Sequence, residues 1–428
     1  MVLLTQIVGR MVVDRAGRHA RLTDMAVDLF GGEYPPVAKL LVDRSGGQRS
    51  SHLIPWDDVR VFGDPIQVDD LDAAPLRCDD ALDGCEVLRR DVLDALVIDL
   101  GQQRTVRVND LWLRSEGPPG GAYDGGSLVV GGIDATPTAI LRRISGPWLG
   151  HRLFGRGDSR QLIDWTDVEV LRGDPHRTFP NPGMTPRVAR LQPARIADLA
   201  EALPYMHAAE MLNLLDIGLA ADVFELTEPA RQLQVLGELD DERAVAILAE
   251  AAPDHAADVL GRLPLDEARR LLERLPRERA RLVIDLLAYP ADTAGGIMTN
   301  ELVWVPLGLT TQDAIDYVRP HLARPDLVYY VYVVDEPDAR RLQGVVTLRD
   351  LLLARPEQPV AEIMNRKLVT AAPCDSAREV AYRLADHQLN ALPVVGDEQR
   401  LLGVITIDSA VGQIAPEALR QSLPRVFT

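Results

Sequence analysis

The sequence has few cysteines, few aromatic residues and no long apolar run. It contains 3 cysteines among 428 residues, and aromatic residues make up 5% of the chain. So few cysteines exclude a disulfide-rich secreted scaffold and suit a reducing compartment. No stretch approaches the roughly 18–20 apolar residues of a membrane helix, and residues 1–9 lack the basic and apolar regions of a signal peptide. We therefore expect a cytoplasmic protein without a membrane span of its own.

Positive charge is scarce as well. Lysine and arginine number 46 against 64 aspartate and glutamate residues, which leaves a formal net charge of −18. A field of this sign repels the phosphates of nucleic acids and attracts cations, so we expect no nucleic-acid partner. The composition itself is globular, with 46% hydrophobic and 26% charged residues. Because 428 residues exceed one ordinary core, the chain is expected to be multidomain.

Residues 1–180 are rich in short strand-like runs separated by Gly, Asp and Pro turn signals. Within this region, residues 54–61 (IPWDDVRV) recur as residues 163–170 (IDWTDVEV). A repeat of this kind predicts two similar β modules. The Ile-x-Trp-x-Asp-Val segments resemble the PRC-barrel, a family of small β-barrels. This resemblance implies all-β PRC-barrel-like modules at residues 1–74 and 75–180.

Glycine becomes rare from residue 187 to 290, where Ala, Leu, Glu and Arg dominate. Pro253, Pro264 and Pro276 recur at intervals of 11 or 12 residues. Proline is tolerated in the first turn of a helix, where its missing N–H would have no partner. Helices this short are marginal alone and must stack on their neighbours. Residues 187–290 are therefore predicted to form an all-α superhelix of solenoid type.

A second repeat begins near residue 297. Residues 297–299 (IMT) are matched by 363–365 (IMN), and residues 344–350 (GVVTLRD) are matched by 403–409 (GVITIDS). In each copy a glycine leads a buried strand, and hydroxyl or carboxylate side chains stand at the start of the next helix. The pattern predicts two α/β copies in tandem.

The two Gly-hydrophobic-hydrophobic-Thr segments resemble a tandem pair of cystathionine-β-synthase (CBS) domains, which implies CBS domains at residues 297–357 and 358–415. Residues 288–299 (AYPADTAGGIMT) resemble the junction before the first CBS domain of MgtE-type magnesium transporters. The combined resemblance covers residues 187–415 and implies the intracellular gating region of that family. In these transporters a membrane domain follows the CBS pair, whereas this sequence stops at Thr428. The resemblance therefore implies a sensor without a pore, and a homodimer formed through the CBS pair.

CBS pairs bind adenine nucleotides in clefts between their two copies, and the resemblance implies nucleotide-binding roles for Thr347, Asp350 and Thr406. A Thr hydroxyl and an Asp carboxylate at a strand-to-helix turn can hold ribose hydroxyls, and a helix start favours phosphates. In the second copy Ser409 stands in place of the Asp, so one cleft is equipped and the other is weakened. Alternatively, Thr347 and Asp350 only cap a helix. ATP or AMP is thus one candidate ligand.

The other candidate ligand is Mg²⁺ or another divalent cation. In MgtE-type transporters Mg²⁺ lies between superhelix and CBS pair, held by the carboxylate oxygens that hard cations prefer. This sequence departs from the family's acidic run, because Ser409 and Gly412 replace acidic residues. Asp408 and Glu417 remain as metal candidates. Acidic residues of the superhelix, such as 240–242, either substitute for the lost carboxylates or simply favour helix starts.

No catalytic motif of the His-Glu-x-x-His, Gly-x-Ser-x-Gly or P-loop kind is present in the sequence, so we expect no enzyme. The leading hypothesis is a soluble regulatory protein that senses a cation or a nucleotide. It would act on a separate partner, such as a membrane cation transporter, and would reach a membrane only through that partner. The alternatives are a nucleotide-responsive adaptor of a soluble enzyme and a ligand-free scaffold.

Overall fold

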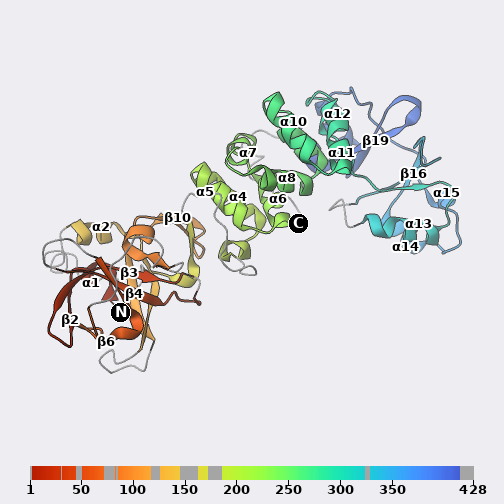
Figure 1. Cartoon of the computed structure of the whole chain (residues 1–428). Helices are drawn as coiled ribbons and strands as arrows, with labels where there is room; N and C mark the ends of the chain where they lie inside the picture. The colour runs from red at the N-terminus through yellow and green to blue at the C-terminus, as the bar shows by residue number, and fades with distance from the viewer. Residues whose placement is uncertain are drawn as a thin grey trace. The chain divides into compact units, whose positions relative to one another are not determined.

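The computed structural model of the protein describes residues 2–29, 31–44, 51–71, 82, 85–116, 126–144, 162–171, 186–322 and 328–414. The described residues fall into two compact units, within residues 1–215 and 216–428. Figure 1 colours the first unit from red to yellow-green and the second from green to blue.

The first unit opens with a β structure. Its strands and short helical segments are β1 (Val2–Leu3), α1 (Leu4–Ile7), β2 (Met11–Asp14), β3 (His19–Val27), β4 (Val37–Arg44), β5 (Ser51–Pro55), η1 (Trp56–Asp58), β6 (Val59–Val61), β7 (Ile66–Val68), β8 (Glu86–Val87), η2 (Leu88–Val92), β9 (Leu96–Asp99), β10 (Arg104–Arg107), β11 (Asp110–Glu116), β12 (Ser127–Asp134), α2 (Pro137–Ile144), β13 (Leu162–Asp164), η4 (Trp165–Asp167) and β14 (Val168–Leu171). The seven-stranded sheet has the order β5-β4-β3-β2-β7-β6, with β8 paired to β3. Two smaller sheets have the orders β1-β11-β12-β13 and β10-β9-β14.

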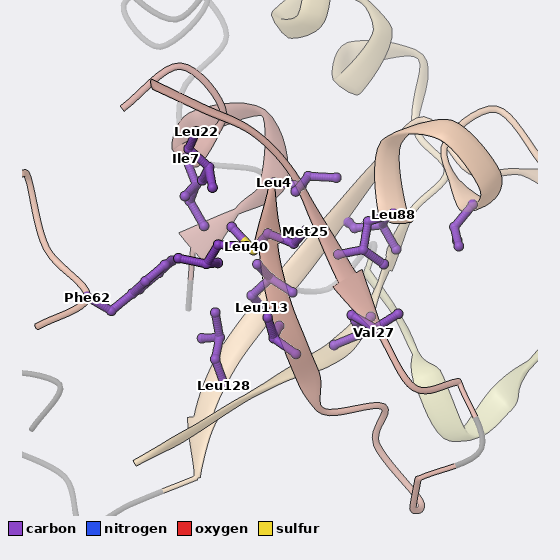
Figure 2. Close-up of a cluster of buried hydrophobic side chains, with 14 of the residues drawn as sticks. Leu4, Ile7, Leu22, Met25, Val27, Leu40, Phe62, Leu88, Leu113 and Leu128 are labelled. Carbon is purple, nitrogen blue, oxygen red and sulfur yellow. The ribbon is translucent and has the colours of Figure 1, made fainter. Parts of the chain in front are cut away.

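The two halves of this β structure share one core. The first strand of the chain, β1, pairs with β11, and β8 pairs with β3, so strand pairing joins segments far apart in the sequence. Figure 2 shows Met25 of β3 in the same cluster of buried side chains as Leu88 of η2 and Leu113 of β11. Burial of such a continuous apolar cluster is the main stabilising term of the unit. The division into modules at residues 1–74 and 75–180, and the likeness of either to a PRC-barrel, stay predictions.

The sequence repeat of this unit is also a structural repeat. In each copy a strand ends in a short 3-10 turn that begins with tryptophan, namely η1 and η4, and a second strand follows directly. Trp165 is 2% exposed and lies in the core, whereas Trp56 packs at the edge of the same core. Asp164 caps its turn by accepting a hydrogen bond from the Thr166 N–H at 3.0 Å.

Three helical segments complete the first unit: η5 (Arg187–Arg190), α4 (Pro193–Ala202) and α5 (Tyr205–Leu214). Helix α4 packs on β10, and α5 packs on β14. The buried Glu169 of β14 accepts hydrogen bonds from the backbone N–H groups of Arg187, at 2.6 Å, and Val188, at 3.2 Å. The first helices of the predicted superhelix are therefore fixed to the β structure by a carboxylate that satisfies the open N–H groups of η5.

The second unit begins with six short helices, here called the helical bundle: α6 (Ile217–Leu226), α7 (Pro229–Leu236), α8 (Asp241–Glu250), α9 (Pro253–Leu260), α10 (Leu265–Arg274) and α11 (Arg277–Leu287). Pro253 is the first residue of α9, and Pro264 and Pro276 are the N-cap residues of α10 and α11. The predicted role of these prolines at helix starts is thereby confirmed. Helix α6 packs on α8, and α9 packs on α11, as expected for helices that must stack.

Two α/β copies follow the bundle. Their elements are α12 (Ala294–Ile297), β15 (Trp304–Pro306), α13 (Thr311–Val318), η6 (Arg319–His321), β16 (Val331–Val334), β17 (Leu342–Val346), α14 (Leu348–Leu353), α15 (Val360–Ile363), α16 (Ala377–Asp386), β18 (Ala391–Val395), η7 (Asp397–Gln399), β19 (Leu401–Thr406) and α17 (Ile407–Ile414). Strands β15, β16 and β17 form one sheet, and β18 and β19 form another.

The two copies are paired by exchange of the segments that precede them. Thr299, ahead of the first copy, pairs with Val404 of the second, and Asn365, ahead of the second copy, pairs with Val345 of the first. Glycine leaves room where each segment crosses the strand, because a Cβ on Gly403 would lie 2.6 Å from the Thr299 carbonyl oxygen, and one on Gly344 would lie 3.0 Å from the Asn365 carbonyl oxygen. The predicted repeat is therefore a pseudo-symmetric pair, and each copy depends on the other for its complete fold.

The predicted multidomain fold class is confirmed: a β-rich region, a helical region and an α/β pair. In the part of the chain that the structure describes, none of the helices combines the length and the apolar character needed to cross a bilayer.

Candidate functional site

The turn between β17 and α14 holds the first two predicted site residues side by side. Thr347 is the N-cap of α14, and its hydroxyl oxygen accepts a hydrogen bond from the Asp350 N–H at 3.0 Å. The same hydroxyl donates to Oδ2 of Asp350 at 2.7 Å, and the Thr347 N–H donates to that oxygen at 3.2 Å. This reciprocal arrangement is a capping box, which satisfies N–H groups that the helix leaves open.

The capping role that sequence analysis left open for Thr347 and Asp350 is thus observed. It engages only one carboxylate oxygen, because Oδ1 of Asp350 accepts no hydrogen bond from the described residues. Asp350 is exposed and Thr347 is half-buried. The box therefore holds a solvent-facing carboxylate in a fixed orientation, with an oxygen left to accept hydrogen bonds from a ligand.

The corresponding turn of the second copy, between β19 and α17, offers fewer groups that could bind a ligand. Thr406 ends β19, and its hydroxyl oxygen accepts a hydrogen bond from the Ser409 N–H at 3.3 Å. The two hydroxyl groups lie 3.1 Å apart. A serine hydroxyl caps the helix start but brings no charge, so the two turns differ by one carboxylate. Among the described residues no hydrogen bond joins Thr347 to Thr406, and we treat each turn as a separate candidate site.

Asp408, the first metal candidate, lies one residue into α17 and is exposed. The Tyr329 hydroxyl donates to its Oδ2 at 3.4 Å. Burial raises the pKa of the Tyr329 hydroxyl, and the neighbouring Asp408 charge raises it further, so this tyrosine remains a neutral donor. Glu417, the second metal candidate, lies outside the described residues.

A divalent cation needs several oxygen donors that converge. Within the described residues, no group of three or more His, Cys, Asp or Glu side chains converges in this way. Asp408 therefore offers a single carboxylate, and the described residues do not form a complete cation site.

The acidic residues of the bundle serve helix starts and ion pairs. Asp240 is the N-cap of α8 and accepts a hydrogen bond from the Arg243 N–H at 2.7 Å. Asp241 pairs with Arg274 at 2.6 Å and with Arg270 at 3.2 Å. These contacts favour the capping interpretation over a metal role for residues 240–242.

One group of polar residues in the second unit was not predicted from the sequence. Arg279 of α11 contacts Glu301, and Asn300 contacts the backbone of α11, at the point where the bundle meets the α/β pair. Nothing local distinguishes Arg279 from the other arginines of α10 and α11. Only the three-dimensional arrangement shows that it is largely buried.

Comparisons with known proteins place the second half of the chain among described families. A family model of the MgtE intracellular N domain matches residues 191–292, and a CBS-domain model matches residues 294–357 and 360–415. The magnesium transporter MgtE of Thermus thermophilus is 42% identical over 133 residues, which is 31% of this chain and 29% of that protein. MgtE of Bacillus subtilis is 31% identical over 231 residues, which is 54% of this chain and 51% of that protein. The chain thus spans about half, or less, of the length of these curated relatives.

Two solved structures are similar to this chain over about half of its length. The crystal structure of the cytosolic domain of the Mg²⁺ channel MgtE in complex with ATP is 35% identical, with a TM-score of 0.50, and covers 53% of this chain and 91% of that chain. The crystal structure of the soluble part of a magnesium transporter is 29% identical, with a TM-score of 0.50, and covers 53% of this chain and 89% of that chain.

Proposed function

Because the chain belongs, through residues 191–415, to the family of MgtE cytosolic domains, we propose that it is a regulatory sensor whose CBS pair binds an adenine nucleotide. The observation that carries this proposal is the exposed Asp350 carboxylate, oriented by Thr347 and left with one oxygen that the described residues do not use. It is supported by a 35% identical relative whose crystal structure contains ATP. The protein would act as a non-catalytic regulator.

In this proposal the ribose of the nucleotide is the group that the turn recognises. The two ribose hydroxyls are donors, and the carboxylate of Asp350 is an acceptor that its capping bonds hold in place. Hydrogen bonds to a charged, pre-oriented acceptor are the stronger kind. Thr406 would take part in the second cleft, where Ser409 supplies no charge. We therefore expect one tight site and one weak site in each chain.

The partner that we propose is inferred from the chain's relatives. The relatives include magnesium transporters, so a membrane cation transporter is the partner we propose, with the chain itself in the cytoplasm. The alternative partner is a soluble enzyme. We also propose a homodimer formed through the CBS pair, because Leu352 and Leu353 of α14 are 75% and 74% exposed. Covering two adjacent leucines this exposed with a second surface would remove apolar area from water, which is favourable.

A divalent cation is the second candidate ligand. Asp408 is exposed and could contribute one donor, with Glu417 as a further one. Because the described residues supply no converging set of donors, we rank this role below nucleotide binding. A titration with Mg²⁺ alone separates the two candidates.

The test is calorimetry with ATP, AMP and Mg²⁺ on the wild-type chain and on two matched variants. Asp350→Asn removes the carboxylate charge at the proposed site. Asp313→Asn removes the same charge from the N-cap of α13, where the Thr310 hydroxyl accepts from the Asp313 N–H at 3.2 Å and donates to Oδ2 of Asp313 at 2.7 Å. Both variants weaken a helix cap by about 0.5–1 kcal/mol.

We expect the Asp350→Asn variant to lose about tenfold or more in ATP affinity, since a hydrogen bond to a charged group contributes roughly 1.5–3 kcal/mol. The Asp313→Asn variant should bind ATP like the wild type. Equal ATP affinity in all three proteins, or no binding to the wild type, would refute the proposed site. A response to Mg²⁺ without any response to nucleotide would instead favour the cation.

A further inference from the structure

Residues 298–303, between α12 and β15 and here called the linker, contact both the helical bundle and the α/β pair. On one side, Thr299 pairs with Val404 of β19, and each backbone N–H donates to the other residue's carbonyl at 2.9 Å. On the other side, the amide of Asn300 donates to the carbonyl of Leu282 in α11 at 2.8 Å. The linker thus touches the bundle only one residue away from its contact with the second CBS copy.

Arg279 supplies the charged contact of this attachment. Its guanidinium donates to Oε1 of Glu301 in the linker at 3.1 Å, and also donates to the carbonyl of Ala251, which ends α8. The side chains of Arg279 and Glu301 are only 11% and 20% exposed. One side chain therefore joins three segments, namely α11, the end of α8 and the linker. We call Arg279, Asn300 and Glu301 the bundle–CBS junction.

Physical chemistry makes this contact hard to replace. The planar guanidinium can donate to a carboxylate and a carbonyl at the same time, whereas a lysine ammonium presents a single point charge. A shielded ion pair adds little compared with an apolar pair of the same size, but removing one partner leaves the other charge unpaired and poorly hydrated. Loss of Arg279 would leave both Glu301 and the Ala251 carbonyl without this donor.

We infer that Arg279 is an internal cation that fixes the helical bundle to the CBS pair, so that the junction closes on a side chain of the protein itself and needs no divalent metal. The structural part of this inference stands on the contacts of Arg279 alone. Its meaning for regulation rests on the proposed sensor function. The junction is distinct from the proposed nucleotide site at Thr347 and Asp350. Its linker nevertheless lies on β19, the strand that ends at Thr406.

The test is hydrogen exchange of the full chain, followed at the paired amides of Thr299 and Val404. We compare Arg279→Met with Arg277→Met, which removes an exposed arginine from the first turn of the same helix. The Arg279→Met variant should exchange at these amides about tenfold faster or more, because a shielded charge loses its partner. The Arg277→Met variant should stay within about twofold of the wild type.

Two further experiments test the junction even if the Arg279→Met variant fails to fold. Glu301→Gln keeps an acceptor but removes the charge, so it should give an intermediate acceleration. Adding or chelating Mg²⁺ should leave the wild-type exchange at Thr299 and Val404 unchanged, and Mg²⁺ should not restore protection in the Arg279 variant. Exchange that depends on Mg²⁺, or an Arg279 variant that behaves like the Arg277 variant, would overturn the inference.

The hydrogen-exchange test of the junction can be separated from the calorimetric test of nucleotide binding. ATP binding, measured by calorimetry on the same variants, should be retained when Arg279 is replaced. If the wild type fails to bind ATP, the proposed function fails while the exchange result at the junction still stands on its own.

Discussion

Replacing Gly403 with alanine tests how the linker and the second CBS copy fit together. A Cβ at this position would lie 2.6 Å from the Thr299 carbonyl oxygen and 2.7 Å from the Met298 sulfur. Ordinary van der Waals contact is 3.4–4 Å, so the Thr299 carbonyl must move by about 0.8 Å. That oxygen accepts the Val404 N–H at 2.9 Å, and the displacement breaks the hydrogen bond.

The magnitude follows from two costs. Overpacking of a filled site costs about 1–3 kcal/mol, and a lost backbone hydrogen bond costs about 1 kcal/mol. A total near 3 kcal/mol lowers the melting temperature of a unit of this size by roughly 6–12 °C, at about 2–4 °C for each kcal/mol. The assay is thermal unfolding followed by circular dichroism, with the transition of residues 216–428 assigned by hydrogen exchange.

Two glycines of the first copy provide matched controls. Gly344→Ala meets the flexible Met364 side chain at 2.7 Å and a backbone oxygen only at 3.0 Å, so it should cost less. Gly308→Ala meets nothing within 4 Å and should change stability by less than about 0.5 kcal/mol. The reasoning would be refuted if Gly403→Ala melted like the wild type, or if Gly308→Ala were equally destabilised.

Three further predictions follow from the same structure. Burial raises the pKa of Asp24 to about 6, so between pH 4 and 6 the folded protein binds more protons at this site than the unfolded chain, and the stability contributed by Asp24 falls as the pH rises through that window. In urea unfolding across this range, the wild type should therefore lose stability relative to the Asp24→Asn variant as the pH rises. Glu169→Ala removes the acceptor of the Arg187 and Val188 N–H groups, and should destabilise the first unit by about 2 kcal/mol in the same assay. Replacing both Leu352 and Leu353 with serine should convert a homodimer to a monomer in analytical ultracentrifugation.

Each of these predictions can fail separately. If the Asp24→Asn variant had the same pH profile as the wild type, the Asp24 carboxyl would titrate in the folded protein as it does in the unfolded chain. Wild-type stability of the Glu169 variant would show that solvent replaces the carboxylate as acceptor. A wild-type chain that sediments as a monomer would remove the support that the exposed leucines give to the dimer.

Local features of the second unit could be predicted from sequence because their causes are local. The helix starts at Pro253 and Pro276 follow from proline geometry, and the capping box of Thr347 and Asp350 from residues three apart. The weakened second turn follows from one substitution, Ser409. In these cases the side chain and the backbone group it bonds are near neighbours in the chain.

Features that depend on distant partners could not be predicted in this way. The pairing of β1 with β11, and the shared core of the β structure, join residues about a hundred positions apart, and no local pattern encodes their register. The same holds for Glu169, which is acidic and therefore unexpected in a buried strand until its two N–H partners are known. Arg279 lies among several exposed arginines and differs from them only in its surroundings.

A crystal structure of the chain grown with ATP tests the central claim most directly. The account predicts one nucleotide in the first cleft, with its ribose hydroxyls within about 2.5–3.0 Å of the Asp350 carboxylate, and weaker density or none beside Thr406. ATP bound elsewhere on the chain, or crystals that contain no nucleotide at saturating concentration, would contradict it.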